Sequence, residues 1–227
     1  MNYPGLELEN FDKAVIWRKY IYFFIKKYIN NKDILEVGAG IGSFTRNYEK
    51  NAKDVTLTEL DNSYFNLLSK QFSNKKIKVV KSLINEINGS FDTILYLNVL
   101  EHIEKDVQEI NSALEKVKSN GYLIILVPAH NKLYSKFDEA VGHFKRYEMN
   151  FFDKLEPRNA KIENLCYLDS IGYFLYFLNK IFFKEETYPS KFKIFLWDKF
   201  FTPISIIFDK LLNYKFGKNI ICIIKKN

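Results

Sequence analysis

The fold of this chain is decided by a glycine-rich stretch, DILEVGAGIGSFT, at residues 33–45. A short apolar segment there is followed by three glycines at alternate positions, Gly38, Gly40 and Gly42. The apolar segment predicts a buried strand over residues 34–37. Glycines directly after it permit a tight turn whose backbone approaches a ligand closely. The stretch therefore predicts a strand that ends in a ligand-binding turn.

Strands and helices are predicted to alternate around this turn. Apolar residues recur at helical spacing over residues 11–29. A helix over 106–117 is expected to stop at Asn120-Gly121, because this pair favours the left-handed backbone that ends helices. The other expected elements are a helix at 63–72 and strands at 34–37, 55–58, 77–80, 93–97, 122–127, 161–168 and 219–224. Such alternation is typical of βαβ units and predicts an α/β, Rossmann-like fold with a doubly wound, mostly parallel sheet.

The alternation breaks after Pro128. Residues 129–150 are polar, aromatic and irregular, and we expect them to form a loop lid. Residues 170–214 have helical patterning rich in Phe, Leu and Ile, and we expect a helical cap inserted over the site. The whole chain, residues 1–227, is predicted to form one domain that carries this lid and this cap.

The bulk composition is that of a soluble globular protein, with 47% hydrophobic and 27% charged residues. The net charge of +7 arises from 34 basic and 27 acidic residues. Such a charge could suit an anionic partner. However, the lysines are spread along the chain, which favours a solvated lysine-rich surface over a nucleic-acid footprint.

The cysteines and the apolar segments indicate the cellular compartment in which the protein is expected. Cys166 and Cys222 stand far apart in apolar surroundings, without a CxxC pair or a histidine cluster, so we expect buried thiols and neither a disulfide nor a metal site. The first residues are too polar and acidic for a signal peptide. The apolar-aromatic stretch at 171–183 is too short to span a bilayer. We therefore expect a cytoplasmic protein.

The spacing of the glycines and the position of two acidic residues, Glu36 and Glu59, indicate which class of ligand this turn can bind. Dinucleotide enzymes use G-x-G-x-x-G/A to place a pyrophosphate at a helix N-terminus, whereas this chain has G-x-G-x-G followed by Ser43. Glu36 precedes the glycines, where it would repel a pyrophosphate and attract an amino group. Glu59, after the second predicted strand, can take ribose hydroxyls of any adenosine cofactor. A capping or surface acid is the alternative interpretation of Glu59 or Asp61.

A segment after the fourth predicted strand completes a family pattern. The chain contains EVGAGIG, then the acid of TELD, and then FDTILYLNVLEHI (residues 91–103). In the order and separation of these three motifs, the chain resembles the class I S-adenosylmethionine-dependent methyltransferases. PAHNKLYSKFDEAVGHFKRY (residues 128–147) and the ending YKFGKNIICIIKK are similar to a bacterial subgroup of small-molecule and glycan type. The resemblance covers nearly the whole chain. It implies S-adenosylmethionine as cofactor and a seven-stranded sheet whose last strand is antiparallel.

The resemblance also implies where the methionine and ribose of the cofactor would lie. Glu36 would lie near the methionine amino group, and the backbone of Gly38, Gly40 and Gly42 would surround the methionine and ribose. Glu59 would hold the ribose hydroxyls.

The remaining cofactor contacts are implied at the ends of later strands. Leu60 would pack on the adenine, and Ser82 and Leu83 would meet its edge. Many relatives have an Asp at that edge, and this chain has none there. Asn98 and Val99 would lie under the methionine end.

Candidate residues for activating the methyl acceptor are the histidines, because all three follow the fourth or fifth predicted strand. His102 and His143 are the candidate catalytic residues, as general bases near neutral pKa. The alternative for His102 is a backbone hydrogen bond in the LEHI turn. His143 lies in DEAVGHFKRY with Asp138, Arg146 and Tyr147, a set that suits an anionic acceptor. A loop held together by internal salt bridges is the alternative.

The sequence therefore predicts a methyltransferase that acts on a small-molecule or glycan-like acceptor, with oxygen favoured over carbon. An RNA methyltransferase is a second hypothesis, motivated by the net charge. An added basic domain is missing, and Asn98-Val99-Leu100-Glu101 stands where amino-methylating enzymes have an N-P-P-Y-type motif.

A third hypothesis is a cofactor-binding protein of a lipid surface that has lost its chemistry. The apolar cap is flanked by lysines at positions 180, 184, 191 and 193. A peripheral membrane contact or a lipid-linked acceptor is therefore the alternative to a cap that only covers the site.

Overall fold

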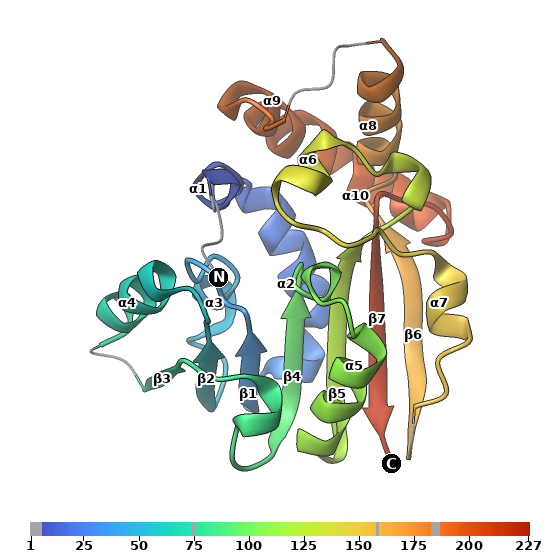
Figure 1. The fold of residues 1–227 in the computed structure, drawn as a ribbon. Helices are drawn as coiled ribbons and strands as arrows, with labels where there is room; N and C mark the ends of the chain where they lie inside the picture. The colour runs from blue at the N-terminus through green and yellow to red at the C-terminus, as the bar shows by residue number, and fades with distance from the viewer. Residues whose placement is uncertain (1–5, 74–75, 158, 183–186) are drawn as a thin grey trace.

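The computed structural model describes residues 6–73, 76–157, 159–182 and 187–227, and its centre is one seven-stranded sheet (Figure 1). The strands are β1 (Asp33–Val37), β2 (Asp54–Thr58), β3 (Ile77–Val80), β4 (Phe91–Leu97), β5 (Val117–Pro128), β6 (Ala160–Leu168) and β7 (Asn219–Lys226). Their order across the sheet is β3-β2-β1-β4-β5-β7-β6. The strands from β3 to β5 pair in parallel, and β7 runs antiparallel to β5 and β6. The predicted sheet and its antiparallel last strand are confirmed.

The winding of the sheet reverses between β1 and β4, which pair in parallel. The chain moves outward from β1 through β2 to β3 and then returns to β4 on the other side of β1. In open α/β sheets, ligands bind outside the carboxyl ends of the strands at such a reversal. The glycine turn directly follows β1, so the sheet places it at this opening.

Helices cover both faces of the sheet and its carboxyl edge. In Figure 1 the helices α1, α6, α8 and α9 gather beyond the tips of β4 and β5. The helices are α1 (Leu6–Phe11), α2 (Val15–Ile29), α3 (Thr45–Tyr48), α4 (Asn62–Gln71), α5 (Asp106–Lys116), α6 (Lys136–Ala140), α7 (Met149–Asp153), α8 (Ser170–Phe182), α9 (Lys191–Leu196) and α10 (Thr202–Leu211). Short helical turns are η1 (Ile84–Glu86), η2 (Leu100–His102), η3 (Asn131–Leu133) and the π-helical turn η4 (Trp197–Phe201).

Each face of the sheet has its own apolar core. Ile21 and Ile25 of α2 lie in the same core as Leu95 of β4. Ile110 of α5 lies with Ile94 in the core of the opposite face. Successive residues of a strand point to opposite faces, so neighbouring positions of one buried strand serve both cores. This explains why the central strands read as continuous apolar runs.

The residues at 129–150, the lid segment, leave and rejoin the sheet at one place. The amide of His130 donates to the carbonyl of Tyr147, and the amide of Tyr147 donates to the carbonyl of Pro128. Helix α6 lies between these two ends. The residues at 170–214, the cap segment, contain α8, α9, η4 and α10, as the helical pattern predicted.

Two boundaries differ from the sequence prediction by more than a residue or two at an element's end. The helix expected from residue 11 begins at Val15 as α2, because the preceding residues turn back toward α1. The pair Asn120-Gly121 lies inside β5, where Asn120 has a φ of 61° and the pairing with β4 shifts register. A Cβ on Gly121 would lie 2.7 Å from the carbonyl oxygen of Asp92. The pair therefore forms a bulge against a neighbouring strand rather than a helix stop.

Among the described helices, none combines the length and the apolar character that a bilayer crossing needs.

Candidate functional site

The glycine turn has a backbone conformation that is unfavourable for residues with a side chain. Gly38, Gly40 and Gly42 have φ values of 65°, 57° and 72°, all in the left-handed region. A Cβ on Gly42 would lie 2.9 Å from a ring carbon of Phe72, and one on Gly38 would lie 2.9 Å from a methyl group of Val99. The sequence thus needs glycine here both for the backbone and for close packing.

Glu59 holds the turn from the end of β2. Its Oε2 atom accepts from the amide of Gly40 at 2.8 Å, and Oε1 accepts from the amide of Asp61 at 2.9 Å. Asp61 itself caps α4 by accepting from the amides of Ser63 and Tyr64. The capping interpretation therefore applies to Asp61, while Glu59 stands beside the turn, where the sequence predicted it.

The residues predicted for the adenine side are open to solvent. Leu60 and Leu83 are about half exposed, at 49% and 48%. Ser82 donates to a carboxylate oxygen of Glu86, which also accepts from the amide of Leu83. These residues follow β2 and β3, on the same side of the reversal as Glu59.

Glu36 is buried beneath the turn at 3% exposure. Its Oε2 atom accepts from Thr45 Oγ1 at 2.6 Å and from the Tyr48 hydroxyl at 2.5 Å. Burial raises the pKa of Glu36 to about 7, although these two hydrogen bonds oppose the shift. The site thus holds a carboxylate that is costly to ionise without a nearby cation.

A cavity of about 230 Å³ joins the turn to the lid segment and the cap segment. The predicted site residues that line it are Glu36, Gly38, Gly40, Asn98, His102 and His143. Asn98 has a φ of 59° at the end of β4, which turns the chain into η2. Val99 packs on Gly38 next to the cavity. The predicted site residues that do not line this cavity are Gly42, Glu59, Leu60, Ser82, Leu83 and Val99.

The start of the chain closes over the turn, which the sequence did not predict. Leu8 of α1 lines the cavity, and its Cδ1 atom would lie 3.3 Å from a Cβ on Gly40. Asp12 accepts from Ser43 Oγ at 2.5 Å and pairs with Arg46. The polar sequence around Asp12 did not predict that it would contact the glycine turn, because its partners Ser43 and Arg46 lie far along the chain.

The lid segment places a histidine–carboxylate pair on the opposite wall. His143 Nδ1 lies 2.7 Å from Asp138 Oδ1, and Arg146 Nε donates to the same oxygen at 2.8 Å. Asp138 is fully buried. Burial would raise the pKa of Asp138, but the hydrogen bond from His143 and the charge of Arg146 lower it to about 2. The carboxylate is therefore ionised and fixes the imidazole of His143.

Two residues of η2 complete this wall. The rings of His102 and His143 meet edge to face with centroids 4.7 Å apart, and Glu101 Oε1 lies 3.9 Å from His143 Nε2. Burial raises the pKa of Glu101 to about 7. Burial and the nearby His143 lower the pKa of His102 to about 4, so this imidazole is neutral at pH 7. Glu101 was missed in the sequence, although it stands next to His102 in LEHI.

Other polar residues of the lid segment serve the structure. Lys145 and the hydroxyl of Tyr147 both pair with Asp106 of α5. His130 stacks on Tyr167 and contacts the carbonyl of Gly217 through Nε2. Internal ion pairs thus hold the lid segment together, and His143 and Arg146, which pair with Asp138, also line the cavity.

The two halves of the cavity fit the donor and acceptor of a methyl transfer. A buried carboxylate, Glu36, suits the ammonium of the methionine part, and the glycines of the turn let that part approach the backbone. Across the cavity stand an oriented imidazole and a guanidinium.

Comparisons with known proteins identify the family and the fold. Residues 12–163 match a family described as a methyltransferase domain. The fold is similar to that of a SAM dependent methyltransferase from Archaeoglobus fulgidus, with a TM-score of 0.59, 19% identity and coverage of 97% of this chain and 100% of that chain. It is also similar to coclaurine N-methyltransferase bound to N-methylheliamine and SAH, with a TM-score of 0.61, 14% identity and coverage of 94% and 72%.

Curated relatives match over part of their length. The ribosomal RNA small subunit methyltransferase A of Mycoplasmopsis pulmonis is 26% identical over 126 residues, which are 51% of this chain and 50% of that protein. The hybrid PKS-NRPS synthetase tasS of Hapsidospora irregularis is 29% identical over 131 residues, which are 52% of this chain and 3% of that protein. The chain thus spans half or less of these relatives. It belongs to the methyltransferase-domain family, with the fold of the S-adenosylmethionine-dependent class I methyltransferases.

Proposed function

We propose that this chain transfers the methyl group of S-adenosylmethionine to a hydroxyl oxygen of a small-molecule or glycan-like acceptor. The observation that carries the proposal is one cavity lined on one side by Glu36 and the glycine turn and on the other by the Asp138–His143 pair. Family membership supports the reaction class. The neighbour with bound SAH supports the cofactor.

On the donor side, each residue has a binding role. Glu36 faces the methionine amino group, and the backbone of the glycine turn surrounds the methionine and ribose. Glu59 takes the ribose hydroxyls, because its carboxylate lies beside the amide of Gly40 at the sheet edge. Leu60, Ser82 and Leu83 border the adenine. Asn98 and Val99 lie under the methionine end.

On the acceptor side, the chain aligns a nucleophile and eases loss of its proton. The cofactor supplies an activated methyl group on a sulfonium, so alignment and proton removal are what the protein adds. His143, oriented by Asp138, is the group placed to activate the acceptor hydroxyl. His102 lies beside it, but its lowered pKa of about 4 and its backbone hydrogen bonds favour the structural alternative for this residue. The pattern of a base held by a carboxylate favours an acceptor that must lose a proton, as oxygen must.

The acceptor is proposed to carry an anionic group. Arg146 is 3% exposed and lines the cavity, and its Nη1 atom has no hydrogen-bond partner. Its Nε atom pairs with Asp138, and its guanidinium stacks over the ring of Tyr176 at 4.5 Å. A buried guanidinium with a spare donor is suited to a carboxylate or phosphate.

Two measurements test the proposal. Calorimetry should show binding of S-adenosylhomocysteine and no binding of NAD, since Glu36 would repel a pyrophosphate. With an acceptor in hand, His143→Ala should lower kcat by about 10²- to 10⁴-fold, because a positioned acid–base group contributes that much. Tight NAD binding would overturn the cofactor assignment. Full turnover of the His143→Ala protein at saturating substrate would overturn the role of His143.

Ribosomal RNA is the second candidate acceptor, because the curated relatives include ribosomal RNA methyltransferases. The segment after β4 reads Asn98-Val99-Leu100-Glu101 and lacks the N-P-P-Y-type motif of amino-methylating enzymes. Methyl transfer from labelled cofactor to small-subunit RNA, compared with transfer to RNA-free extract, separates the two acceptors.

A further inference from the structure

A carboxylate and two imidazoles meet in the acceptor half of the cavity. One ligand atom each from Glu101, His102 and His143 lies within 4.8 Å of the other two. Glu101 Oε1 and His143 Nε2 are 3.9 Å apart. Ligand atoms placed about 2.1 Å from a tetrahedral cation lie about 3.4 Å from one another. Small rotations of these side chains would therefore bring all three within reach of one ion.

Glu101 carries a polar atom that the protein leaves unsatisfied. The residue is 1% exposed and lines the cavity. Its Oε2 atom is buried without a hydrogen-bond partner. An unpaired buried carboxylate oxygen is costly, because it has given up water without replacement. A cation bound at this point would remove the cost.

Both imidazoles are held as metal-ligating histidines usually are. His143 Nδ1 lies 2.7 Å from Asp138 Oδ1, so with Nδ1 as the donor the atom left to bind a cation is Nε2, which lies 3.9 Å from Glu101 Oε1. His102 has hydrogen bonds with the backbone of Val141 and Gly142, on the lid segment. Metal-bound histidines nearly always donate their other ring N–H to a carboxylate or a backbone carbonyl.

We propose that Glu101, His102 and His143 bind a divalent transition-metal cation next to the methyl donor. Two imidazole nitrogens and one carboxylate oxygen suit Zn²⁺, Mn²⁺ or Fe²⁺ better than Mg²⁺ or Ca²⁺. Asp138 and Arg146 cancel in charge, and Glu101 would be the anionic ligand of the cation.

This inference rests on the proposed function and gives its chemistry. An acceptor hydroxyl bound to the cation loses its proton more readily, because the cation stabilises the oxyanion. The O–H bond breaks and the proton passes to water. The oxygen then forms its bond to the methyl carbon as the bond from that carbon to sulfur breaks, leaving a methyl ether and a neutral thioether. With Nδ1 on Asp138 and Nε2 on the cation, His143 would act on the hydroxyl through the cation instead of accepting its proton directly.

The test measures metal binding to the full chain with saturating S-adenosylhomocysteine. Visible absorption during titration with Co²⁺ should show one site per chain, and Zn²⁺ should displace the Co²⁺. Glu101→Gln and His143→Gln should each weaken binding by at least about 100-fold, since loss of an outer-shell partner alone costs 10- to 100-fold. Glu104→Gln removes an exposed carboxylate three residues along and should bind like the wild type.

Binding of S-adenosylhomocysteine distinguishes failure of the metal site from failure of the proposed function, and it shows whether each variant is folded. A wild-type protein that binds S-adenosylhomocysteine but none of Co²⁺, Zn²⁺ and Mn²⁺ overturns the metal site and leaves the proposed function standing. A Glu101→Gln protein that binds Co²⁺ as tightly as the wild type also overturns it. Failure to bind S-adenosylhomocysteine would instead count against the proposed function. If Glu101→Gln does not fold, His102→Gln replaces it in the same titration with the same criteria.

Discussion

At the residue scale, three glutamates near the same strand ends differ through their partners. Glu36 accepts from two hydroxyl groups, and Glu59 accepts from two backbone amides. Glu101 has an oxygen with no partner. A sequence shows only that each is an acid. The partners come from other elements, and they decide which carboxylate holds the turn and which keeps an oxygen without a hydrogen-bond partner.

The first prediction concerns Glu36 and pH. Its pKa is raised to about 7, mainly by burial, so its carboxylate is mostly protonated below that pH and ionised above it. An ammonium group binds beside the ionised form. The affinity for S-adenosylhomocysteine should therefore rise roughly tenfold from pH 6 to pH 8, as the ionised fraction grows. Calorimetry across this range checks the trend.

Glu36→Gln is the control for that trend. Its amide oxygen can still accept from Thr45 and Tyr48, but it cannot ionise. The variant should bind more weakly at pH 8 and show a flat profile. An equally steep rise in the variant would assign the pH dependence to another group.

The second prediction concerns Gly42. Gly42→Ala forces a side chain onto a φ of 72° and places its Cβ 2.9 Å from the ring of Phe72. Gly89→Ala makes a similar backbone demand at a φ of 94°, with no atom within 4 Å. Overpacking costs roughly 1–3 kcal/mol, so Gly42→Ala should lower the free energy of unfolding by about that much more than Gly89→Ala. Urea unfolding measures both, and equal losses would disprove the packing argument.

At the element scale, distant residues supply the starts of helices. Helix α2 begins after Ala14, which has no capping side chain. Asp198 of η4 accepts from the amide of Trp17 at 2.9 Å and from that of Ile16 at 3.2 Å. Asp209 of α10 likewise accepts from the amides of Asp169 and Ser170 at the start of α8. The cap segment is thereby fastened to α2 and to Asp169, the residue that follows β6.

The third prediction follows from this fastening. Asp198→Ala leaves two amides of α2 without their acceptor, so it should cost about 1–2 kcal/mol, as loss of a helix cap does. For a chain of this size the melting temperature should fall by roughly 2–8 °C. Asp153→Ala, an exposed residue of α7, is the matched control and should change little. Calorimetric melting of both proteins is the measurement, and an unchanged Asp198→Ala protein would refute the capping role.

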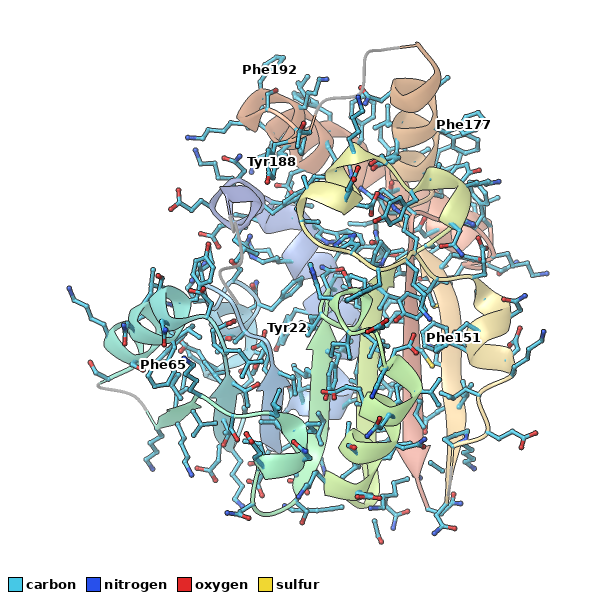
Figure 2. The ribbon with its side chains drawn as sticks, in the orientation of Figure 1. Tyr22, Phe65, Phe151, Phe177, Tyr188 and Phe192 are labelled. Carbon is cyan, nitrogen blue, oxygen red and sulfur yellow. The ribbon has the colours of Figure 1, made fainter. Side chains whose placement is uncertain are left out.

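At the scale of the whole molecule, the cap segment leaves a broad apolar surface. Figure 2 shows Phe177 of α8 and Phe192 of α9 at the outer rim, away from the sheet. The exposed apolar residues of α9, η4 and α10 are Phe192, Phe195, Phe200, Ile204, Ile207, Phe208 and Leu211. Exposed lysines at 191, 193, 199 and 210 lie among them. The side chain of Lys180 and all of Lys184, two lysines of the sequence prediction, lie outside what the structure describes.

A surface of this kind fits an anionic bilayer, which would bring a lipid-linked acceptor to the cavity. We predict that the protein sediments with vesicles containing anionic lipid and less with neutral vesicles. The double variant Phe192→Ser/Leu211→Ser should bind at least about tenfold more weakly, because two large apolar side chains lose their burial. Phe23→Ser, which changes an equally exposed residue of α2, is the control. If the protein does not sediment with anionic vesicles, the membrane contact is disproved, and the cap segment only covers the site.

Much of the fold could be predicted because its signals are local. The apolar runs at 34–37 and 93–97 mark strands through their burial on both faces, and the glycines mark the turn at the reversal. Asn120-Gly121 misled the prediction, since its bulge depends on pairing with β4 and no local pattern reports that contact. Likewise, Leu8 and Asp12 reach the turn only through tertiary packing.

The sequence by itself determined the parallel sheet, the position of the glycine turn and the candidate residues Glu36, Glu59, His102 and His143. These follow from periodicity, backbone freedom and spacing, which are properties of neighbouring residues. Only the tertiary structure decided that Glu101 joins the two histidines in one cavity, because the lid segment and η2 are far apart in the chain. Burial and partners are set when the sheet edge brings them together, and these fix the chemistry that each side chain can perform.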